Sequence, residues 1–258
     1  MSRAHSGLDK HKSDYLHAVL NKDKGSAEEV VRKMIGEGLS LGEVYQVLGR
    51  VEAEVGSLWE KGSITVSDEH YATDVTIGCV SMAADRLRTF RRQPAGFAYL
   101  SSVDGEFHVV GLQMLSELLR SKGWDTELRL SGTLQSALKT LAAGRRVDLF
   151  CLSATMPSNV PRVAEAARAI RETPAFKDAK ILAGGAAFED REARESIRAG
   201  SEQPGLVDYL ASNFSEALEF AKSISMDTEQ AHGTRQQREP VGSTANAQRA
   251  RGRRVSLS

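Results

Sequence analysis

The stretch FAYLSSVDGEFHVVGLQMLSELLRSKG, residues 97–123, decides the fold of this 258-residue chain. It opens with an apolar run, passes through a polar turn, and continues as a helical pattern that ends at Gly123. The same order of strand and helix then returns until about residue 224. Strict alternation of this kind predicts an α/β fold with a parallel, doubly wound sheet.

The alternating region, residues 97–225, is expected to form a flavodoxin-like (Rossmann-type) domain with a five-stranded parallel sheet. The expected strands are FAYLSSV (97–103), DTELRL (125–130), VDLFCLSA (147–154), AKILAGG (179–185) and LVDYLAS (206–212). Ligands of such sheets bind at the carboxyl ends of the strands, near the point where the strand order reverses. The loops after the first, third and fourth strands are therefore the expected binding loops.

Residues 10–92 carry four helical patterns with short connections, which predicts an antiparallel four-helix bundle. Two of the helices are expected to begin at a capping box, because Ser26 and Ser40 are each followed three residues later by a glutamate. Residues 1–9 are expected to be an N-terminal tail, and RRQPAG (91–96) a linker. By pattern alone, a plain dimerisation or scaffolding module is the favoured interpretation of the bundle.

Composition and charge exclude several classes of protein. The formal net charge is zero, so the whole chain is not an electrostatic nucleic-acid binder. Cys79 and Cys151 are far apart, which indicates neither a disulfide framework nor a zinc site and fits a reducing compartment. Neither a signal peptide nor an apolar run of about 18 residues is present, so a cytoplasmic protein without a membrane span is expected. Residues 226–258 are polar and Arg-rich and are expected to form a disordered, solvated tail.

The loop after the first strand holds Glu106, His108 and Gly111 in the sequence EFHVVG. A histidine can offer one ring nitrogen to a metal while a nearby carboxylate accepts a hydrogen bond from the other. A glycine allows a ligand to pass close to the backbone. The competing interpretation is a histidine that caps a helix beside an ordinary turn.

This motif resembles the Asp/Glu-x-His-x-x-Gly motif of cobalamin-binding domains. The resemblance implies that His108 is the lower axial ligand of cobalt and that Glu106, Phe107 and Gly111 line the cofactor site. Glu106 stands where aspartate is commoner, and a longer contact to His108 is therefore expected.

Three further segments resemble the same family at the expected loops. They are LSATMP (152–157), LAGGAAF (182–188) and LVDYLASNFSEAL (206–218). In that family the nucleotide tail of the cofactor, displaced by the histidine, runs down into the sheet. The resemblance implies that six residues contact this tail or line its channel: Ser153, Thr155, Gly184, Gly185, Tyr209 and Ser212. A nucleotide or FMN is the weaker alternative, because no GxGxxG follows the first strand.

The bundle carries a second pattern, Trp59 followed after nine residues by Glu69 and His70, in WEKGSITVSDEH. By itself it is a bundle-end tryptophan with a solvated polar pair. Beside the cobalamin motif, it is similar to the spacing in CarH-like light-sensing cobalamin regulators. That resemblance implies that Trp59 caps the adenosyl group, that Glu69 holds it, and that His70 ligates cobalt after photolysis.

The resemblances together imply an adenosylcobalamin-dependent photoreceptor, not an enzyme. Photolysis of its cobalt–carbon bond would change its oligomeric state or its binding of a separate regulatory protein. The MerR-type DNA-binding domain of CarH-like regulators is not expected in this sequence. The alternative is a corrinoid methyl-carrier protein of a methyltransferase system, with methylcobalamin as its cofactor form, and a mutase subunit is a weaker one. A photoreceptor with an added bilin, as in photocobilins, is a minor alternative for which the sequence shows no attachment motif.

Overall fold

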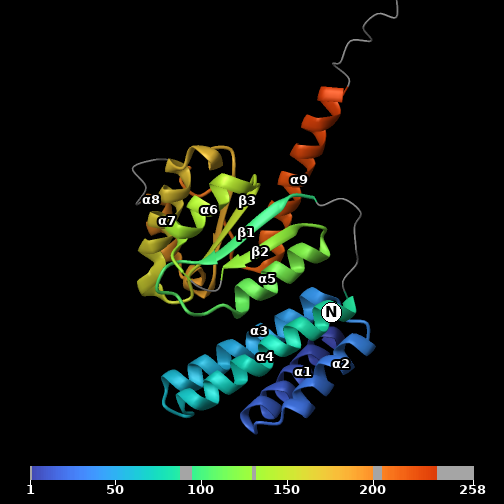
Figure 1. Ribbon diagram of the computed structural model, residues 1–258. Coiled ribbons are helices and arrows are strands. Elements are labelled where there is room, and N and C mark those ends of the chain that lie inside the picture. Colours follow the sequence, from blue (N-terminus) through green and yellow to red (C-terminus); the bar gives the residue numbers. More distant parts are fainter. Residues whose placement is uncertain (1, 88–94, 130–131, 200–204, 237–258) are drawn as a thin grey trace, which may run out of the picture. The chain divides into compact units, whose positions relative to one another are not determined.

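The structure, a computed structural model, describes residues 2–87, 95–129, 132–199 and 205–236 (Figure 1). Its α-helices are α1 (Ser2–Leu20), α2 (Lys24–Gly36), α3 (Leu41–Glu60), α4 (Val66–Leu87), α5 (Val110–Ser121), α6 (Leu134–Gly144), α7 (Val160–Glu172), α8 (Arg191–Ala199) and α9 (Phe214–Gln236). Its strands are β1 (Phe97–Ser102), β2 (Asp125–Arg129), β3 (Leu149–Ser153), β4 (Lys180–Gly184) and β5 (Tyr209–Leu210). Short 3-10 turns are η1 (Pro157–Asn159), η2 (Pro174–Phe176) and η3 (Ala186–Glu189).

The five strands form one parallel sheet in the order β2-β1-β3-β4-β5, so the predicted flavodoxin-like α/β architecture is confirmed. Apolar side chains of α6, α7 and α8 pack with one face of the sheet, around Phe150. Those of α5 and α9 pack with the other face, around Leu100. The strand order reverses between β1 and β3, which places the loops after these two strands at the switch point.

Helices α1 to α4 form the predicted four-helix region. Their shared core includes Tyr15, Met34, Tyr45 and Leu48, all completely buried. Met114 and Leu118 of α5 belong to the same apolar cluster. Helix α5 therefore lies between the helical region and the sheet, and it fixes the loop that precedes it against both.

The capping box at Ser40 is confirmed, but the one expected at Ser26 is wrong. At Ser40, the side chain accepts a hydrogen bond from the Glu43 N–H and the glutamate bonds back to the Ser40 N–H. Helix α2 instead begins at Lys24, because Asp23 is its N-cap and accepts from the Ser26 N–H at 2.9 Å. The aspartate is an equally good cap and lies three residues earlier in the chain.

Two expected tails differ from the structure. Residues 2–9 are the first turns of α1, where Leu8 packs against the helical core and Asp9 lies 3.8 Å from Arg50. Residues 226–236 continue α9, in a segment with no proline before Pro240. The rest of the expected tail, 237–258, and residues 88–94, which include most of the expected linker, lie outside the described residues. Within the described ranges, no helix is both long and apolar enough to cross a membrane.

Candidate functional site

The predicted Glu106–His108 pair lies in the loop between β1 and α5, at the carboxyl end of β1. The Glu106 carboxylate is buried and hydrogen-bonds directly to the His108 ring through Nδ1, so the expected longer contact is wrong. Its other oxygen accepts from the backbone N–H of Thr155 at 2.9 Å and of Met156 at 3.0 Å, and from Asn159 Nδ2 at 3.1 Å. The loops after β1 and β3 are thereby joined through one carboxylate.

This hydrogen bonding fixes the charge of Glu106 and the tautomer of His108. Burial alone would raise the pKa of Glu106, but the hydrogen bonds from His108, Met156, Asn159 and Thr155 outweigh it and hold this pKa well below its usual range. An ionised carboxylate only accepts hydrogen bonds, so the His108 Nδ1 facing it carries a hydrogen. A neutral ring then keeps its lone pair on Nε2. The His108 side chain is about half exposed, at 48%, so this nitrogen is available to a metal.

The pKa of His108 is raised, mainly by its hydrogen bond to Glu106. Partial burial opposes this shift, and the negative charges of Glu106 and Glu69 add to it. The contribution of Glu69 brings a residue of α4 within electrostatic range of the histidine.

The predicted channel residues lie at the carboxyl ends of β3 and β4. Ser153 pairs in register with Gly184, and both are the last residues of their strands. Gly185 has a φ of +109°, and a Cβ added there would lie 2.3 Å from the Ala154 carbonyl oxygen. Only glycine fits this close approach. Thr155 contributes its backbone N–H to Glu106, and a contact of its side chain with a cofactor stays a prediction.

Tyr209 and Ser212 lie at and just beyond β5. The Tyr209 ring stacks on Phe220 of α9, with centroids 5.0 Å apart, and is 37% exposed. The Ser212 hydroxyl accepts a hydrogen bond from Arg194, and its backbone N–H donates to Glu216 at 2.8 Å. Both side chains therefore have structural partners here, and their roles in binding stay predictions.

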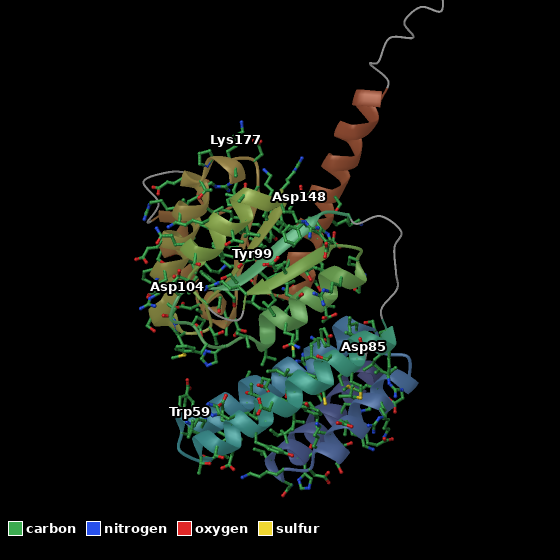
Figure 2. The ribbon with its side chains drawn as sticks, in the orientation of Figure 1. Trp59, Asp85, Tyr99, Asp104, Asp148 and Lys177 are labelled. Atoms are coloured by element: carbon green, nitrogen blue, oxygen red, sulfur yellow. The ribbon has the colours of Figure 1, made fainter. Side chains whose placement is uncertain are left out.

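Trp59 lies before the turn between α3 and α4, and Glu69 and His70 lie after it, so their joint role at a cofactor stays a prediction. Trp59 is in the last turn of α3 and is 42% exposed; its side chain projects from the helix surface (Figure 2). Gly62, at a φ of +69°, closes the turn by donating to the Trp59 carbonyl at 2.8 Å. His70 Nε2 lies 3.5 Å from a Glu69 carboxylate oxygen, and the His70 side chain is 73% exposed.

Sequence reasoning missed Asn159 and Met156, which hold Glu106 from the loop after β3. Met156 lay inside the LSATMP segment, but no pattern indicates that its backbone N–H is the relevant group. Asn159 lies 53 positions from Glu106 in the chain, so only the folded sheet brings them together. Phe107, a predicted site residue, is 88% exposed beside His108.

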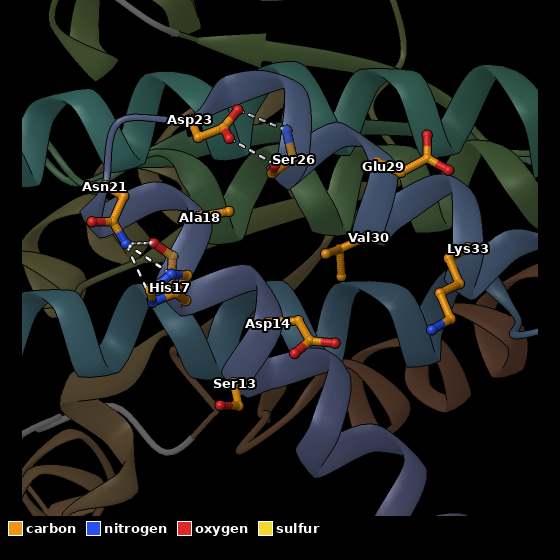
Figure 3. Close-up of a pocket in the computed structure, with 10 residues that line it drawn as sticks. All are labelled: Ser13, Asp14, His17, Ala18, Asn21, Asp23, Ser26, Glu29, Val30 and Lys33. Carbon is orange, nitrogen blue, oxygen red and sulfur yellow. Dashed lines mark hydrogen bonds between the residues drawn. The ribbon is translucent and has the colours of Figure 1, made fainter.

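One hollow lies at the predicted site and another lies away from it. One, of about 240 Å³, lies beside the ends of β1 and β2 and is lined in part by Glu106, Phe107 and Arg129. The other, of about 570 Å³, lies between α1 and α2 and is lined by polar side chains such as His17 and Asn21 (Figure 3). The second hollow shares no residue with the predicted site, whereas the first is continuous with its histidine loop.

Comparison with known proteins indicates the class of domain to which these loops belong. Residues 97–205 match a family described as B12 binding domain, and residues 12–83 match a second family with the same description. The chain contains a B12-binding domain with its helical cap. The first match spans the Glu106–His108 motif and the loops after β3 and β4. The second spans Trp59, Glu69 and His70.

Relatives of this B12-binding domain protein are named as corrinoid proteins. Dimethylamine corrinoid protein 1 of Methanosarcina acetivorans is 23% identical over 221 residues, which cover 83% of this chain and 91% of that protein. Dimethylamine corrinoid protein 3 of the same organism is 25% identical over 208 residues, 78% of this chain and 86% of that protein. The solved monomethylamine corrinoid protein of Methanosarcina barkeri has a TM-score of 0.65 at 19% identity, over 81% of this chain and 96% of that one, and it shares the fold.

The residues of the B12-binding domain fit a cobalt corrinoid. His108 offers a single, oriented ring nitrogen, and among the described residues no three His, Cys, Asp or Glu side chains gather to hold a bare metal ion. That donor set suits a metal that arrives already held by its own macrocycle. Gly185 lets the loops after β3 and β4 approach each other closely, because the Ala154 carbonyl oxygen and the Ser153 hydroxyl stand where a Cβ would lie. The chain is thus a corrinoid-binding protein, and its named relatives are methylamine corrinoid proteins, not CarH-like photoreceptors.

Proposed function

We propose that this protein is a corrinoid methyl carrier, which holds a cobalt corrinoid over His108 and presents it to a methyltransferase. The observation that carries the proposal is the Glu106–His108 pair at the switch point of a B12-binding fold. The similarity to dimethylamine corrinoid proteins, over nine-tenths of the length of one of them, supports it. When bound, a cobalt corrinoid supplies a metal centre that accepts a methyl group and later releases it.

The chain's own residues orient the cofactor. Glu106 keeps the hydrogen on Nδ1 of His108, so that Nε2 points its lone pair away from the loop. Thr155, Met156 and Asn159 hold the carboxylate in turn, so the histidine ring cannot turn freely. This arrangement provides a lower ligand that is already in place before a cofactor arrives.

The exposure of residues expected above the cofactor, on the side opposite His108, favours a carrier over a light sensor. A carrier must admit a methyltransferase to the metal, and the exposure of Trp59 and His70 is consistent with an accessible upper side. The comparisons support the carrier better than the photoreceptor that the Trp59, Glu69 and His70 spacing indicated. We assign to Glu69 and Trp59 a role in bounding the upper side of the cofactor.

We also propose how the chain is divided. Residues 10–92 act as the cap and residues 97–225 as the corrinoid-binding domain. The partner is a methyltransferase that gives or takes the methyl group, and methylcobalamin is the loaded form of the cofactor.

The proposal is tested by cofactor selectivity in the dark and after green light. A carrier binds methylcobalamin and aquacobalamin at least as tightly as adenosylcobalamin, and its elution from a sizing column does not change on illumination. The variant His108→Ala is the control, because it removes the lower ligand from a half-exposed position. Selective binding of adenosylcobalamin with a light-driven change in elution would contradict the carrier and restore the photoreceptor.

A further inference from the structure

A chain of polar side chains crosses the interior of the helical cap. It begins at Tyr15 of α1, whose hydroxyl lies 3.1 Å from the Thr76 hydroxyl of α4. Thr76 donates to Glu52 Oε1 of α3 at 2.7 Å. The other oxygen of Glu52 lies 3.0 Å from the Thr73 hydroxyl, which in turn lies 3.2 Å from Glu69 Oε1. Tyr15 and Thr76 are completely buried, while Glu52, Thr73 and Glu69 are partly exposed.

The number of hydrogens shared by these polar side chains decides whether a carboxyl group among them is protonated. The Thr73 hydroxyl has one hydrogen, yet it lies within hydrogen-bond distance of carboxyl oxygens of both Glu52 and Glu69. If both groups were ionised, both could only accept, and one contact would join two acceptors with no hydrogen between them. A single proton on Glu52 Oε2 removes the conflict. Glu52 then donates to Thr73, and Thr73 donates to Glu69.

The surroundings place that proton on Glu52, not on Glu69. Burial raises the pKa of Glu52, and the negative charge of Glu69 adds to this, while hydrogen bonds from Thr76 and Thr73 oppose it without cancelling it. Among the described residues Glu52 forms no ion pair, and the titratable groups that face it are Tyr15 of α1 and Glu69 of α4. Glu69 is partly exposed, at 21%, and has the His70 ring at 3.5 Å.

We infer that Glu52 is a neutral carboxylic acid that acts as a positioning residue, holding Glu69 through Thr73 at the cofactor-facing start of α4. The role of Glu69 at the cofactor rests on the proposed function. The pairing of Glu52 with Thr73 does not, because it follows from hydrogen-bond geometry inside the cap. The consequence is that each contact of the Thr73 hydroxyl holds one hydrogen, so that Glu52, Thr73 and Glu69 form one continuous run of hydrogen bonds.

The first test is an infrared difference spectrum between the full chain and Glu52→Gln, recorded without corrinoid at neutral pH. The inference expects a carboxylic-acid C=O band in the wild type that the variant lacks. A spectrum with only carboxylate bands for Glu52 would overturn the inference. Because no cofactor is present, that result would leave the proposed function untouched.

The second test compares aquacobalamin affinity in Glu52→Gln, Glu52→Ala and Thr73→Val, each checked by thermal unfolding. The glutamine amide donates to Thr73 and accepts from Thr76 as the neutral acid does, so Glu52→Gln is expected to bind within about twofold of wild type. Glu52→Ala and Thr73→Val release Glu69 and are expected to bind about threefold to tenfold more weakly, the worth of one hydrogen bond. Equal losses in Glu52→Gln and Glu52→Ala, or no loss in any variant, would overturn the positioning role. A wild-type chain that binds no aquacobalamin while the acid band is present would instead contradict the proposed function.

Discussion

The substitution Glu106→Gln tests the histidine loop with almost no change of shape. The glutamine oxygen can still accept from Thr155, Met156 and Asn159, as Glu106 Oε2 does now. Its amide group then replaces the oxygen that accepts from the His108 ring. The amide is a donor, so His108 must turn Nδ1 into an acceptor and move its hydrogen to Nε2. The nitrogen that would ligate cobalt is thereby blocked.

The size of the effect follows from the bond that is lost. A hydrogen bond to a charged group contributes about 1.5–3 kcal/mol. At about 1.4 kcal/mol for each factor of ten, affinity is expected to fall about 10- to 100-fold. Loss of a partner that orients a metal-bound histidine commonly has an effect of about this size. The free chain should also lose stability, by about 1–3 kcal/mol, because Glu106 Oε1 accepts a hydrogen bond from the His108 backbone N–H at 3.2 Å as well, and an amide group at that position cannot accept it.

The assay is a titration of the cofactor-free chain with aquacobalamin, followed by absorption, with unfolding by urea to check the fold. Glu127→Gln is the matched control, because it makes the same change at an exposed position of β2. The control should bind as wild type does. If Glu106→Gln bound within about twofold of wild type with the same spectrum, the reasoning about the tautomer would be refuted.

Three further outcomes are expected. Gly185→Ala should destabilise the chain by more than about 2 kcal/mol in urea unfolding, because of its φ of +109° and a backbone oxygen 2.3 Å from the added Cβ; a smaller loss would show that the loop relaxes. Gly111→Ala has open space around its Cβ, so stability should change by at most about 1 kcal/mol while corrinoid affinity falls, and unchanged affinity would remove this glycine from the site. The pKa of Asp68 lies below its usual range, mainly because Lys22 hydrogen-bonds its carboxylate, so the stability this gives is present near neutral pH and is lost as the pH falls below about 4. The advantage of wild type over Asp68→Asn in urea unfolding should therefore shrink in acid, and a constant difference would contradict the assignment.

The features that could be predicted from the sequence are those that depend on residues close together in the chain. The sheet follows from apolar runs that alternate with helical periods, and this signal does not depend on distant contacts. The Glu106–His108 pair was predictable because two residues of one loop need no tertiary structure to meet. The close backbone approach at Gly185 was predictable for a similar reason, since a glycine at a strand end indicates such an approach, whereas its part in binding stays a prediction.

Contacts between residues that lie far apart in the sequence were not predictable. Asn159 reaches Glu106 only because β1 and β3 are neighbours in the sheet. The N-cap of α2 is Asp23 and not Ser26. Both residue types are good N-caps, and the sequence alone does not decide between them. The polar chain through Glu52 depends on the packing of α3 against α4.

The prediction of a light-sensing function had a different weakness, because it depended on the spacing of only three residues. The Trp59, Glu69 and His70 spacing indicated a light sensor, whereas the matched relatives are named as methylamine corrinoid proteins. Three residues of a helical region that matches a B12-binding family carry little information on what a bound cofactor does. The Glu106–His108 motif indicated the cofactor class, and the B12-binding family match over residues 97–205 supports it.

The most direct test of the account is the electron paramagnetic resonance spectrum of unlabelled cob(II)alamin bound to the nitrogen-15-labelled chain. The account predicts that each cobalt line is split into a doublet, because the lower ligand is a protein nitrogen, and that His108→Ala abolishes this doublet. A triplet in the labelled complex would mean that the cofactor keeps its own base as the lower ligand. That result would contradict the assignment of His108 and, with it, the corrinoid site described above.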